Sequence, residues 1–367
     1  MKKYLTMFIY TPMANTGRFK VNDFSNDCEK MISNVQKLLI QNTEWISRYT
    51  KYAQKINANL EKIKKAKEKR FHEWAPLYLY MNVTEAKGQR IFSLRYLGQD
   101  VAKLKVATDK ITIATKGFDV KNERDFGCNV KLEDSEWKSK DAASFRGHFS
   151  SHPKALGIAK KKNEEHRIES LLLTIFAKKK GIDKILCNIQ PVKLAGIARF
   201  QMPTPLRASD INNVKYVGSA GGGIDIISRI GRGSITKLCI MELKDENKPL
   251  EPSAKVIQQG LAYAVFIREL LRSESGAEWW KIFGFGGKLP EQLELYVTCV
   301  MPSIKVNDTS FGCKIIKTAK DTFNLNYIYF KENDNNVEAI ETSLKQCSVK
   351  TIYEESVSVS LKLPNLN

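Results

Sequence analysis

Two short segments decide the fold of the C-terminal half of this chain: Gly221-Gly222-Gly223-Ile224-Asp225-Ile226-Ile227 and, further along, Glu242-Leu243-Lys244. They belong to two apolar runs, Ile224–Arg229 and Ile235–Leu243, whose composition is typical of β-strands. The turn residues Gly231-Arg232-Gly233-Ser234 separate the two runs. The pattern therefore predicts a β-hairpin.

This hairpin brings acidic side chains together. Successive side chains of a strand point to opposite faces, so Glu242 and Lys244 share one face and Leu243 points into the core. Asp225 is expected opposite the end of the second strand, beside Glu242. An Asp in an apolar run is costly to bury without a partner, and a divalent cation shared with Glu242 supplies one. Two carboxylates that hold Mg²⁺, with an ammonium beside them, suit phosphodiester hydrolysis.

The motif resembles that of a known enzyme superfamily. Asp225, followed after sixteen residues by Glu242-x-Lys244, resembles the signature of the PD-(D/E)XK nucleases. A helix expected over Ser253–Arg272 carries Gln259 and Tyr263, which resemble the QxxxY signature of the RecB-type branch. A helix expected over Asn163–Lys180 precedes the strands, and the runs Ile185–Ile189 and Leu194–Phe200 are also strand-like. Residues 160–300 are therefore expected in the order helix, three strands, helix, strand. The Pro that usually precedes the motif Asp is absent, and Ile224 stands there.

The resemblance implies an α/β (α+β) fold with a restriction-endonuclease-like core, in which helices flank a central mixed sheet. It implies a metal-dependent nuclease that hydrolyses phosphodiester bonds of DNA with Mg²⁺, for which Mn²⁺ can substitute. The implied catalytic residues are Asp225, Glu242, Lys244, Gln259 and Tyr263. The implied metal ligands are Glu169, Asp225, Glu242 and Leu243.

Several alternatives remain open at this stage. Glu165 competes with Glu169 as the helix acid, and Glu169 could instead be a surface residue paired with a Lys or Arg one turn away. Packing alone also accounts for Gln259 and Tyr263. Two other functions are a catalytically silent nuclease-fold protein that binds DNA, and a nuclease that acts on RNA. The presence of both acids and the lysine argues against the protein without catalysis, because a site that no longer cleaves has no chemical need for these residues.

The charge of the chain indicates a polyanionic partner. There are 59 Lys and Arg against 40 Asp and Glu, which gives a net charge of +19. Nucleic acid is the first partner that fits such an excess, and an anionic membrane surface is the second. Together with the nuclease resemblance, the expected partner is double-stranded DNA. The basic residues concentrate around the helix expected at 163–180, namely Lys154, Lys160, Lys161, Lys162, Arg167, Lys178, Lys179 and Lys180.

Residues 1–150 are expected to form an N-terminal helical and β-rich region that binds or positions substrate, and residues 151–367 the nuclease domain. One helix is expected over Asp23–Arg70. Either this helix packs its apolar stripe on the rest of the chain, or it is a basic helical arm that lies along a phosphate backbone. The stripe comprises Trp45, Tyr49, Tyr52, Ile56, Leu60 and Ile63. Short β-type runs between residues 77 and 114 predict a small antiparallel sheet or barrel, and residues 131–163 are expected to be rich in loops.

The remaining features favour a cytoplasmic protein with no membrane role. The seven cysteines are scattered and include no CxxC pair, which fits reduced thiols. No apolar run reaches the roughly 18 residues of a membrane span, and the first residues match a signal peptide poorly. His166 is expected on a helix face without a metal, and Trp279-Trp280 in packing. The oligomeric state is not predicted.

Overall fold

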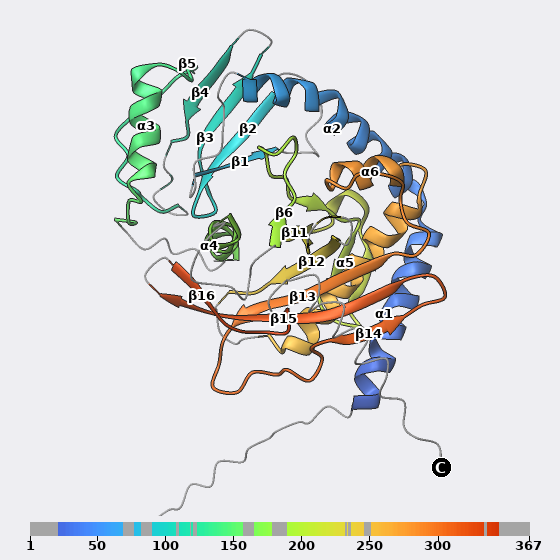
Figure 1. Cartoon of the computed structure of the whole chain (residues 1–367). Helices are drawn as coiled ribbons and strands as arrows, with labels where there is room; N and C mark the ends of the chain where they lie inside the picture. The colour runs from blue at the N-terminus through green and yellow to red at the C-terminus, as the bar shows by residue number, and fades with distance from the viewer. Residues whose placement is uncertain are drawn as a thin grey trace, which may run out of the picture.

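The computed structural model describes residues 21–68, 77–81, 90–107, 110–117, 119, 123–156, 165–177, 189–231, 233, 236–245, 251–333 and 336–344. Within these residues the chain is mixed α/β, as expected (Figure 1). The N-terminal sheet lies at the upper left of Figure 1 and the C-terminal sheet along the bottom, with α4 (Glu165–Ala177) between them. No described helix has the length and apolar composition needed to cross a membrane.

A seven-stranded mixed sheet forms the centre of the C-terminal half. Its strands lie in the order β14 (Lys314–Lys317), β15 (Thr322–Asn333), β13 (Glu294–Pro302), β12 (Lys237–Leu243), β11 (Ile226–Ile230) and β6 (Ile189–Pro191), with β16 (Asn336–Thr342) also paired to β15. Strands β12, β13 and β15 run parallel, and the other neighbours are antiparallel. The predicted hairpin is confirmed, because β11 pairs with β12 in a register that sets Ile226 opposite Met241.

Helix α5 (Ser253–Arg272) connects the parallel strands β12 and β13 and packs against both. Its bounds are those predicted from the sequence. Helix α6 (Gly276–Ile282) follows, and its two tryptophans pack as expected: Trp279 is buried, and Trp280 stacks on Phe285 with ring centroids 3.9 Å apart.

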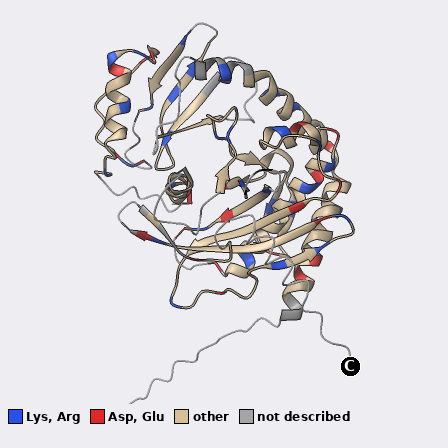
Figure 2. Cartoon of the chain, in the orientation of Figure 1, with Lys and Arg blue, Asp and Glu red and all other residues tan. Residues whose placement is uncertain are grey.

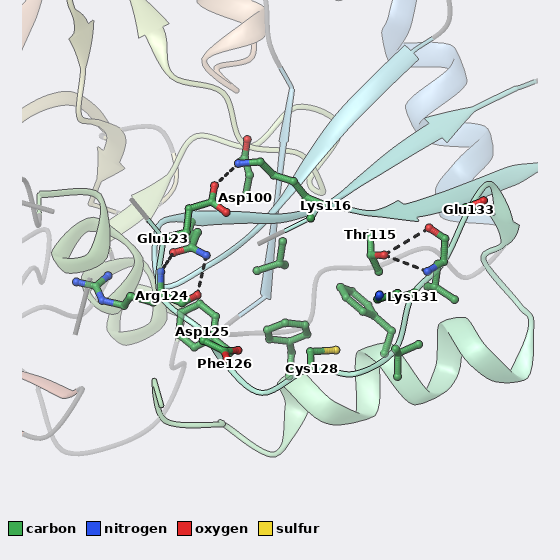
Figure 3. A pocket seen from close by; sticks show the side chains of 17 residues that line it. Asp100, Thr115, Lys116, Glu123, Arg124, Asp125, Phe126, Cys128, Lys131 and Glu133 are labelled. Carbon is green, nitrogen blue, oxygen red and sulfur yellow. Dashed lines mark hydrogen bonds and ion pairs between the residues drawn. The ribbon is translucent and has the colours of Figure 1, made fainter. Parts of the chain in front are cut away.

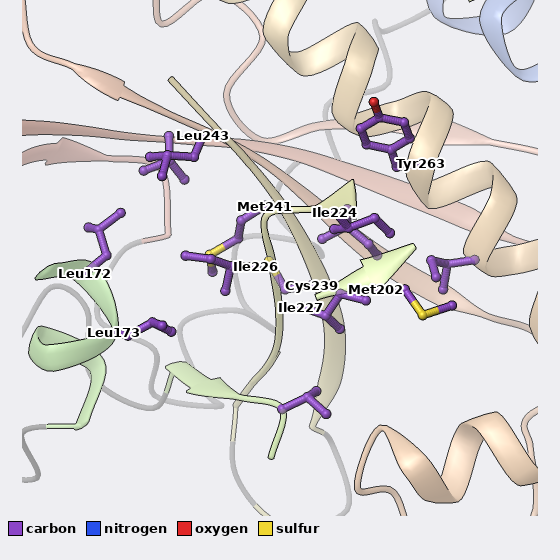
Figure 4. Packing of buried hydrophobic residues seen from close by; sticks show 14 of the residues in the cluster. Leu172, Leu173, Met202, Ile224, Ile226, Ile227, Cys239, Met241, Leu243 and Tyr263 are labelled. Atoms are coloured by element: carbon purple, nitrogen blue, oxygen red, sulfur yellow. The ribbon is translucent and has the colours of Figure 1, made fainter. Parts of the chain in front are cut away.

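On the other side of the hairpin, α4 contributes Leu172 and Leu173 to the core beside Ile226 and Met241 (Figure 4). The predicted ends of this helix, residues 163–164 and 178–180, lie outside the described residues. The hairpin is thus enclosed by helices on both sides, which limits where a polar side chain on it can reach solvent.

The N-terminal helix prediction is wrong in one respect, because two helices replace one: α1 (Val21–Gln41) and α2 (Glu44–Glu68). The Asn42 side chain donates to the Leu38 carbonyl at 2.8 Å, and the Trp45 indole donates to the Leu39 carbonyl at 3.1 Å. These bonds satisfy carbonyls at the end of α1, which lets the helix stop. The part of the apolar stripe whose side chains the structure describes packs inward: the Tyr49 and Phe266 ring centroids are 4.9 Å apart, and Tyr49 and Ile56 are fully buried.

The small antiparallel sheet is confirmed, with strands β1 (Leu77–Met81), β2 (Arg90–Tyr96), β3 (Gln99–Val106), β4 (Ile111–Thr115) and β5 (Ser135–Glu136) in that order. The loop expected over 131–163 is wrong in part, because it contains α3 (Lys140–Ser150). The Ser139 hydroxyl accepts from the Ala142 N–H at 3.2 Å and caps this helix, which buries Phe145 and Phe149.

Five short elements fill the chain between β6 and β11: β7 (Met202–Pro203), β8 (Leu206–Ala208), β9 (Val214–Tyr216), the 3₁₀ turn η2 (Gly218–Ala220) and β10 (Gly223–Ile224). A strand expected over Leu194–Phe200 is wrong. Ala195 and Gly196 have φ of 50° and 74°, and the Leu194 N–H donates to the Ala198 carbonyl at 2.7 Å, so the chain turns there.

The N-terminal sheet is joined to the C-terminal half by backbone hydrogen bonds. The Arg199 N–H donates to the Leu79 carbonyl and the Met81 N–H to the Arg199 carbonyl, both at 2.8 Å. At Gly98, an added Cβ would lie 2.4 Å from the His166 carbonyl carbon, so the β2–β3 turn presses on the start of α4. Buried residues of both halves belong to one hydrophobic cluster. The division near residue 150 stays a prediction.

Candidate functional site

Asp225 lies between β10 and β11 and is half-buried. Its Oδ2 accepts a hydrogen bond from the Leu243 N–H at 2.8 Å. Because Ile226 pairs with Met241, the register carries Asp225 to the level of Glu242. Asp225 is thus held by the main chain at the end of β12, where the sequence predicted it.

Glu242 and Lys244 lie on the same side of the chain, as predicted. The Lys244 Nζ is 3.2 Å from Glu242 Oε1. Glu242 is only 3% exposed, and its other oxygen, Oε2, has no hydrogen-bond partner among the described residues. An unpartnered carboxylate oxygen at this depth is unfavourable, so it marks a position where a cation or donor would gain much.

Lys244 is the centre of an acidic group. Besides Glu242, its Nζ is 3.6 Å from Glu165 Oε1 and 3.9 Å from Glu251 Oε2. The side chain of Leu243, between Glu242 and Lys244, is fully buried in the core (Figure 4). Only the main chain of Leu243 can therefore take part in the site.

The two candidate acids of α4 have different surroundings. Glu165 approaches Lys244, whereas Glu169 is 6% exposed and accepts from the Tyr80 hydroxyl at 2.9 Å. Its second oxygen is 3.1 Å from Nδ1 of His166. Glu169 is therefore not a surface residue paired with a Lys or Arg, and both acids remain candidates for the helix ligand.

Gln259 and Tyr263 share a face of α5, and the Gln259 amide lies 3.4 Å from the Tyr263 hydroxyl. A Cβ at Gly260, between them, would lie 3.4 Å from the Glu242 Cβ, so this face of α5 borders the acids. A Cβ at Gly222 would meet only the Tyr263 hydroxyl, at 3.6 Å. Tyr263 is buried and packs in the core while its hydroxyl lies near Gln259. Its position is therefore compatible with both the packing role and the site role considered from the sequence.

The electrostatics of the site follow from burial and crowding of acids. Burial, with Glu165 and Glu169 adding to it, raises the pKa of Asp225 to about 7, although the Leu243 hydrogen bond acts against this. Burial and the Asp225 charge raise the pKa of Glu242 well above its usual value. Burial disfavours the Lys244 ammonium, but the acids around it outweigh this and raise its pKa. Without a cation, the site is an acid cluster that favours protonation.

Three residues make contacts at this site that the sequence did not predict. The hydrogen bond of His166 to Glu169 raises the pKa of the imidazole, and the i, i+3 spacing on one helix could have indicated the pair. Glu251 was not singled out. Tyr80 reaches Glu169 from a strand 89 residues earlier, and no local pattern in the sequence points to that contact.

One of the basic residues predicted around α4 differs from expectation. Arg167 is buried and makes a two-pronged ion pair with Glu332, so it is not a phosphate-binding surface residue. Lys154 is exposed. The remaining residues of that group, Lys160 to Lys162 and Lys178 to Lys180, lie outside the described residues. Figure 2 shows basic residues on elements of both halves, α2 and α3 among them.

A cavity of about 400 Å³ lies elsewhere, between β3, β4 and α3 (Figure 3). Phe126 and Cys128 line it, and none of the predicted site residues does. Two of its polar side chains, Lys116 and Glu123, are paired with each other. The predicted chemistry is therefore not located at this cavity.

Within the described residues, no three His, Cys, Asp or Glu side chains are grouped as a ready-made metal site. Comparison of the chain with protein-family models, curated proteins and solved structures gave no match.

Proposed function

We propose that this chain is a Mg²⁺-dependent nuclease that hydrolyses phosphodiester bonds of DNA, with a restriction-endonuclease-like core. One observation carries the proposal: Asp225 and Glu242 lie together at the end of the β11–β12 hairpin, with the Lys244 ammonium 3.2 Å from Glu242. The chain order α4, β6, β11, β12, α5, β13, with the short elements β7 to β10 between β6 and β11, supports the proposal.

The donor set fits a hard divalent cation. Carboxylate oxygens are the preferred protein ligands of Mg²⁺, and Glu242 Oε2 is buried without a hydrogen-bond partner among the described residues. The Asp225 charge makes ionisation of Glu242 more costly, and Glu165 and Glu169 do the same for Asp225. A bound dication would reverse that cost. Asp225, Glu242, the Leu243 main chain and one acid of α4 would hold the ion. When bound, it supplies Lewis-acid stabilisation and lowers the pKa of a bound water.

The chain's own groups have distinct roles in this proposal. The Leu243 N–H fixes the Asp225 carboxylate, which limits its rotation. Lys244 provides a fixed positive charge where the phosphate gains negative charge, an arrangement that stabilises a transition state more than a ground state. Gln259 and Tyr263 present an amide and a hydroxyl beside the acids, where they would orient the scissile phosphate.

The test is cleavage by Asp225→Asn, Glu242→Gln and Lys244→Met, assayed on supercoiled, linear and single-stranded DNA with and without Mg²⁺. Each change is expected to lower the rate by at least about 10²-fold, because each removes a metal ligand or the positive charge. Glu294→Gln is the matched control, since Glu294 is a half-buried acid paired with Lys237 at the opposite end of β12.

Two outcomes would contradict the proposal. Undiminished cleavage by Asp225→Asn with an unchanged circular dichroism spectrum would show that the catalytic site is assigned wrongly. Equal cleavage rates with and without excess chelator would show that the reaction does not depend on a metal. An RNA panel run in parallel identifies the RNA-directed alternative. DNA binding by the wild type without cleavage under any metal condition identifies the silent one.

A further inference from the structure

The hairpin formed by β8 and β9 carries two like charges directly opposite each other. Arg207 pairs with Lys215 in the antiparallel register, and both side chains are exposed. Opposed like charges destabilise a strand pair. Neither residue makes an ion pair within the described part of the chain. The face of this hairpin thus presents two uncompensated positive charges at the spacing of neighbouring strands.

The hairpin is fixed to the candidate active site at both ends. At its tip, the Ile211 N–H donates to Gln258 Oε1 at 3.3 Å, and Asp210 pairs with Lys255 at 3.3 Å. Gln258 and Lys255 belong to the first turns of α5, next to Gln259. The one acid of the turn is therefore occupied by Lys255 and does not neutralise the exposed pair.

The other end leads into the glycine-rich loop before Asp225. Arg207 Nη2 donates to the Ala220 carbonyl at 3.2 Å, which ties the hairpin to η2. At Gly221 an added Cβ would lie 1.8 Å from the Thr204 carbonyl oxygen, so the loop packs directly on the chain that enters β8. Gly222 is exposed, and its position faces the Tyr263 hydroxyl. A loop of small residues, flanked by the Arg48 guanidinium at Gly218 and by the Gln201 side chain at Gly223, therefore runs from the hairpin to Tyr263 and Asp225.

From this arrangement we infer that the β8–β9 hairpin and the loop at residues 218–223 form the surface on which duplex DNA lies at the site, with Arg207 and Lys215 neutralising phosphates of its backbone. This inference rests on the proposed function. Phosphates resolve the repulsion between the two cations, and such contacts position the duplex without reading its sequence. The acids beyond the loop would repel DNA, so nearby positive charge is needed to bring the backbone close.

The experiment measures binding of a fluorescent duplex to the full chain by anisotropy across a salt series, in Ca²⁺ to suppress turnover, together with cleavage in Mg²⁺. Arg207→Gln combined with Lys215→Gln is expected to reduce the magnitude of the log affinity against log salt slope by about 1.8, which corresponds to two phosphate contacts. Binding at about 0.15 M salt should weaken at least about tenfold, equally for unrelated sequences.

Two controls separate charge from structure. Lys317→Gln combined with Lys320→Gln removes two exposed lysines at the β14 edge of the seven-stranded sheet, one on β14 and one in the turn after it, and should leave the slope unchanged. Arg207→Lys keeps the charge but changes the group that bonds Ala220, and should keep most of the affinity. If Arg207→Lys weakens binding as much as Arg207→Gln, Arg207 affects binding by holding the loop at Ala220 and not by its charge, and the inference is wrong.

The outcome for the wild type distinguishes this inference from the proposed function. If the wild type cleaves DNA and the double variant binds with an unchanged slope, the surface lies elsewhere and the nuclease proposal stands. If the wild type neither binds nor cleaves duplex DNA in any metal, the proposed function fails and this inference fails with it.

Discussion

Asp225 combines two properties that are hard to reconcile in a carboxylate without a cation. It is held by the Leu243 N–H, which favours its charged form, yet burial and nearby acids raise its pKa to about 7. Since the pKa of an Asp in the unfolded chain is about 3.8, the folded protein binds more protons than the unfolded one between about pH 4 and pH 7. The contribution of this group to stability is therefore complete below about pH 4 and is lost as the pH rises towards 7.

Asp225→Asn is expected to remove this pH dependence. Without divalent metal, the Tm of the variant should rise relative to the wild type as the pH increases from 5 to 8, because the amide cannot ionise. Added Mg²⁺ should stabilise the wild type more at pH 8 than at pH 5, since the ion binds the deprotonated acids. Thermal unfolding with and without Mg²⁺ measures both effects. Parallel curves for the two proteins would show that Asp225 does not titrate in this range.

Gly222 offers a steric test of access to the site. Nothing but the Tyr263 hydroxyl lies within 4 Å of an added Cβ, and the residue is exposed, so a larger side chain fits without unfolding the chain. Gly222→Leu should lower cleavage about tenfold or more by covering Tyr263, with a change in unfolding free energy of less than about 1 kcal/mol. Gly286→Leu, at a glycine with no atom near its Cβ, is the control for adding an exposed leucine. Equal rates for both variants and the wild type would place the substrate elsewhere.

At the scale of elements, sequence patterns succeeded where periodicity and burial agree. The hairpin of β11 and β12 was predictable because its apolar runs are buried on both sides, and α5 because its pattern is long and its first residue follows Pro252. The turn at 194–198 was not predictable from apolar content. Ala195 has a left-handed backbone conformation, which alanine rarely adopts unless tertiary contacts stabilise it. Helix α3 was concealed by its charged sequence, although the Ser139 cap was a usable signal.

Helix α5 can be tested at Gly260, where it approaches the sheet. An added Cβ would lie 3.1 Å from Val297 Cγ1 and 3.4 Å from the Glu242 Cβ. Gly260→Val is expected to destabilise the protein by about 1–3 kcal/mol, because a branched side chain forces the helix away from β12 and β13. Urea unfolding measures the change. Gly260→Ala adds a smaller side chain, which crowds the contact less and increases the helix propensity. If it lowers the unfolding free energy as much as Gly260→Val does, the contact between the helix and the sheet tolerates no extra atom.

At the scale of the whole molecule, the sequence could predict the parts of the site that lie close along the chain. Asp225, Glu242 and Lys244 lie within one hairpin, so strand geometry alone brings them together. The contact of Tyr80 with Glu169 depends on how the N-terminal sheet docks on α4, which no local spacing encodes. The Arg167–Glu332 pair, which overturned a predicted phosphate contact, has the same long-range origin.

This docking predicts that the N-terminal sheet positions an acid of the site. Tyr80→Phe removes the hydrogen bond from β1 to Glu169, and Tyr78→Phe is a matched control, because the Tyr78 hydroxyl lies 2.6 Å from Thr174 Oγ1 on the same helix. Both variants should lose a similar unfolding free energy of about 1 kcal/mol. Only Tyr80→Phe should weaken Mg²⁺ binding, by about tenfold, since partners that orient a ligand carboxylate affect metal affinity.

Calorimetric titration of each metal-free variant with Mg²⁺ measures the difference directly, and urea unfolding checks that the two substitutions are equally disruptive. If both tyrosine variants bind the ion as the wild type does while Glu165→Gln weakens binding, the ligand from α4 is Glu165. In that case Tyr80 joins the sheet to the helix without acting on the metal. A specific loss in Tyr80→Phe would instead show that residues from both halves of the chain build one site, because Tyr80 is held on β1 and Glu169 on α4.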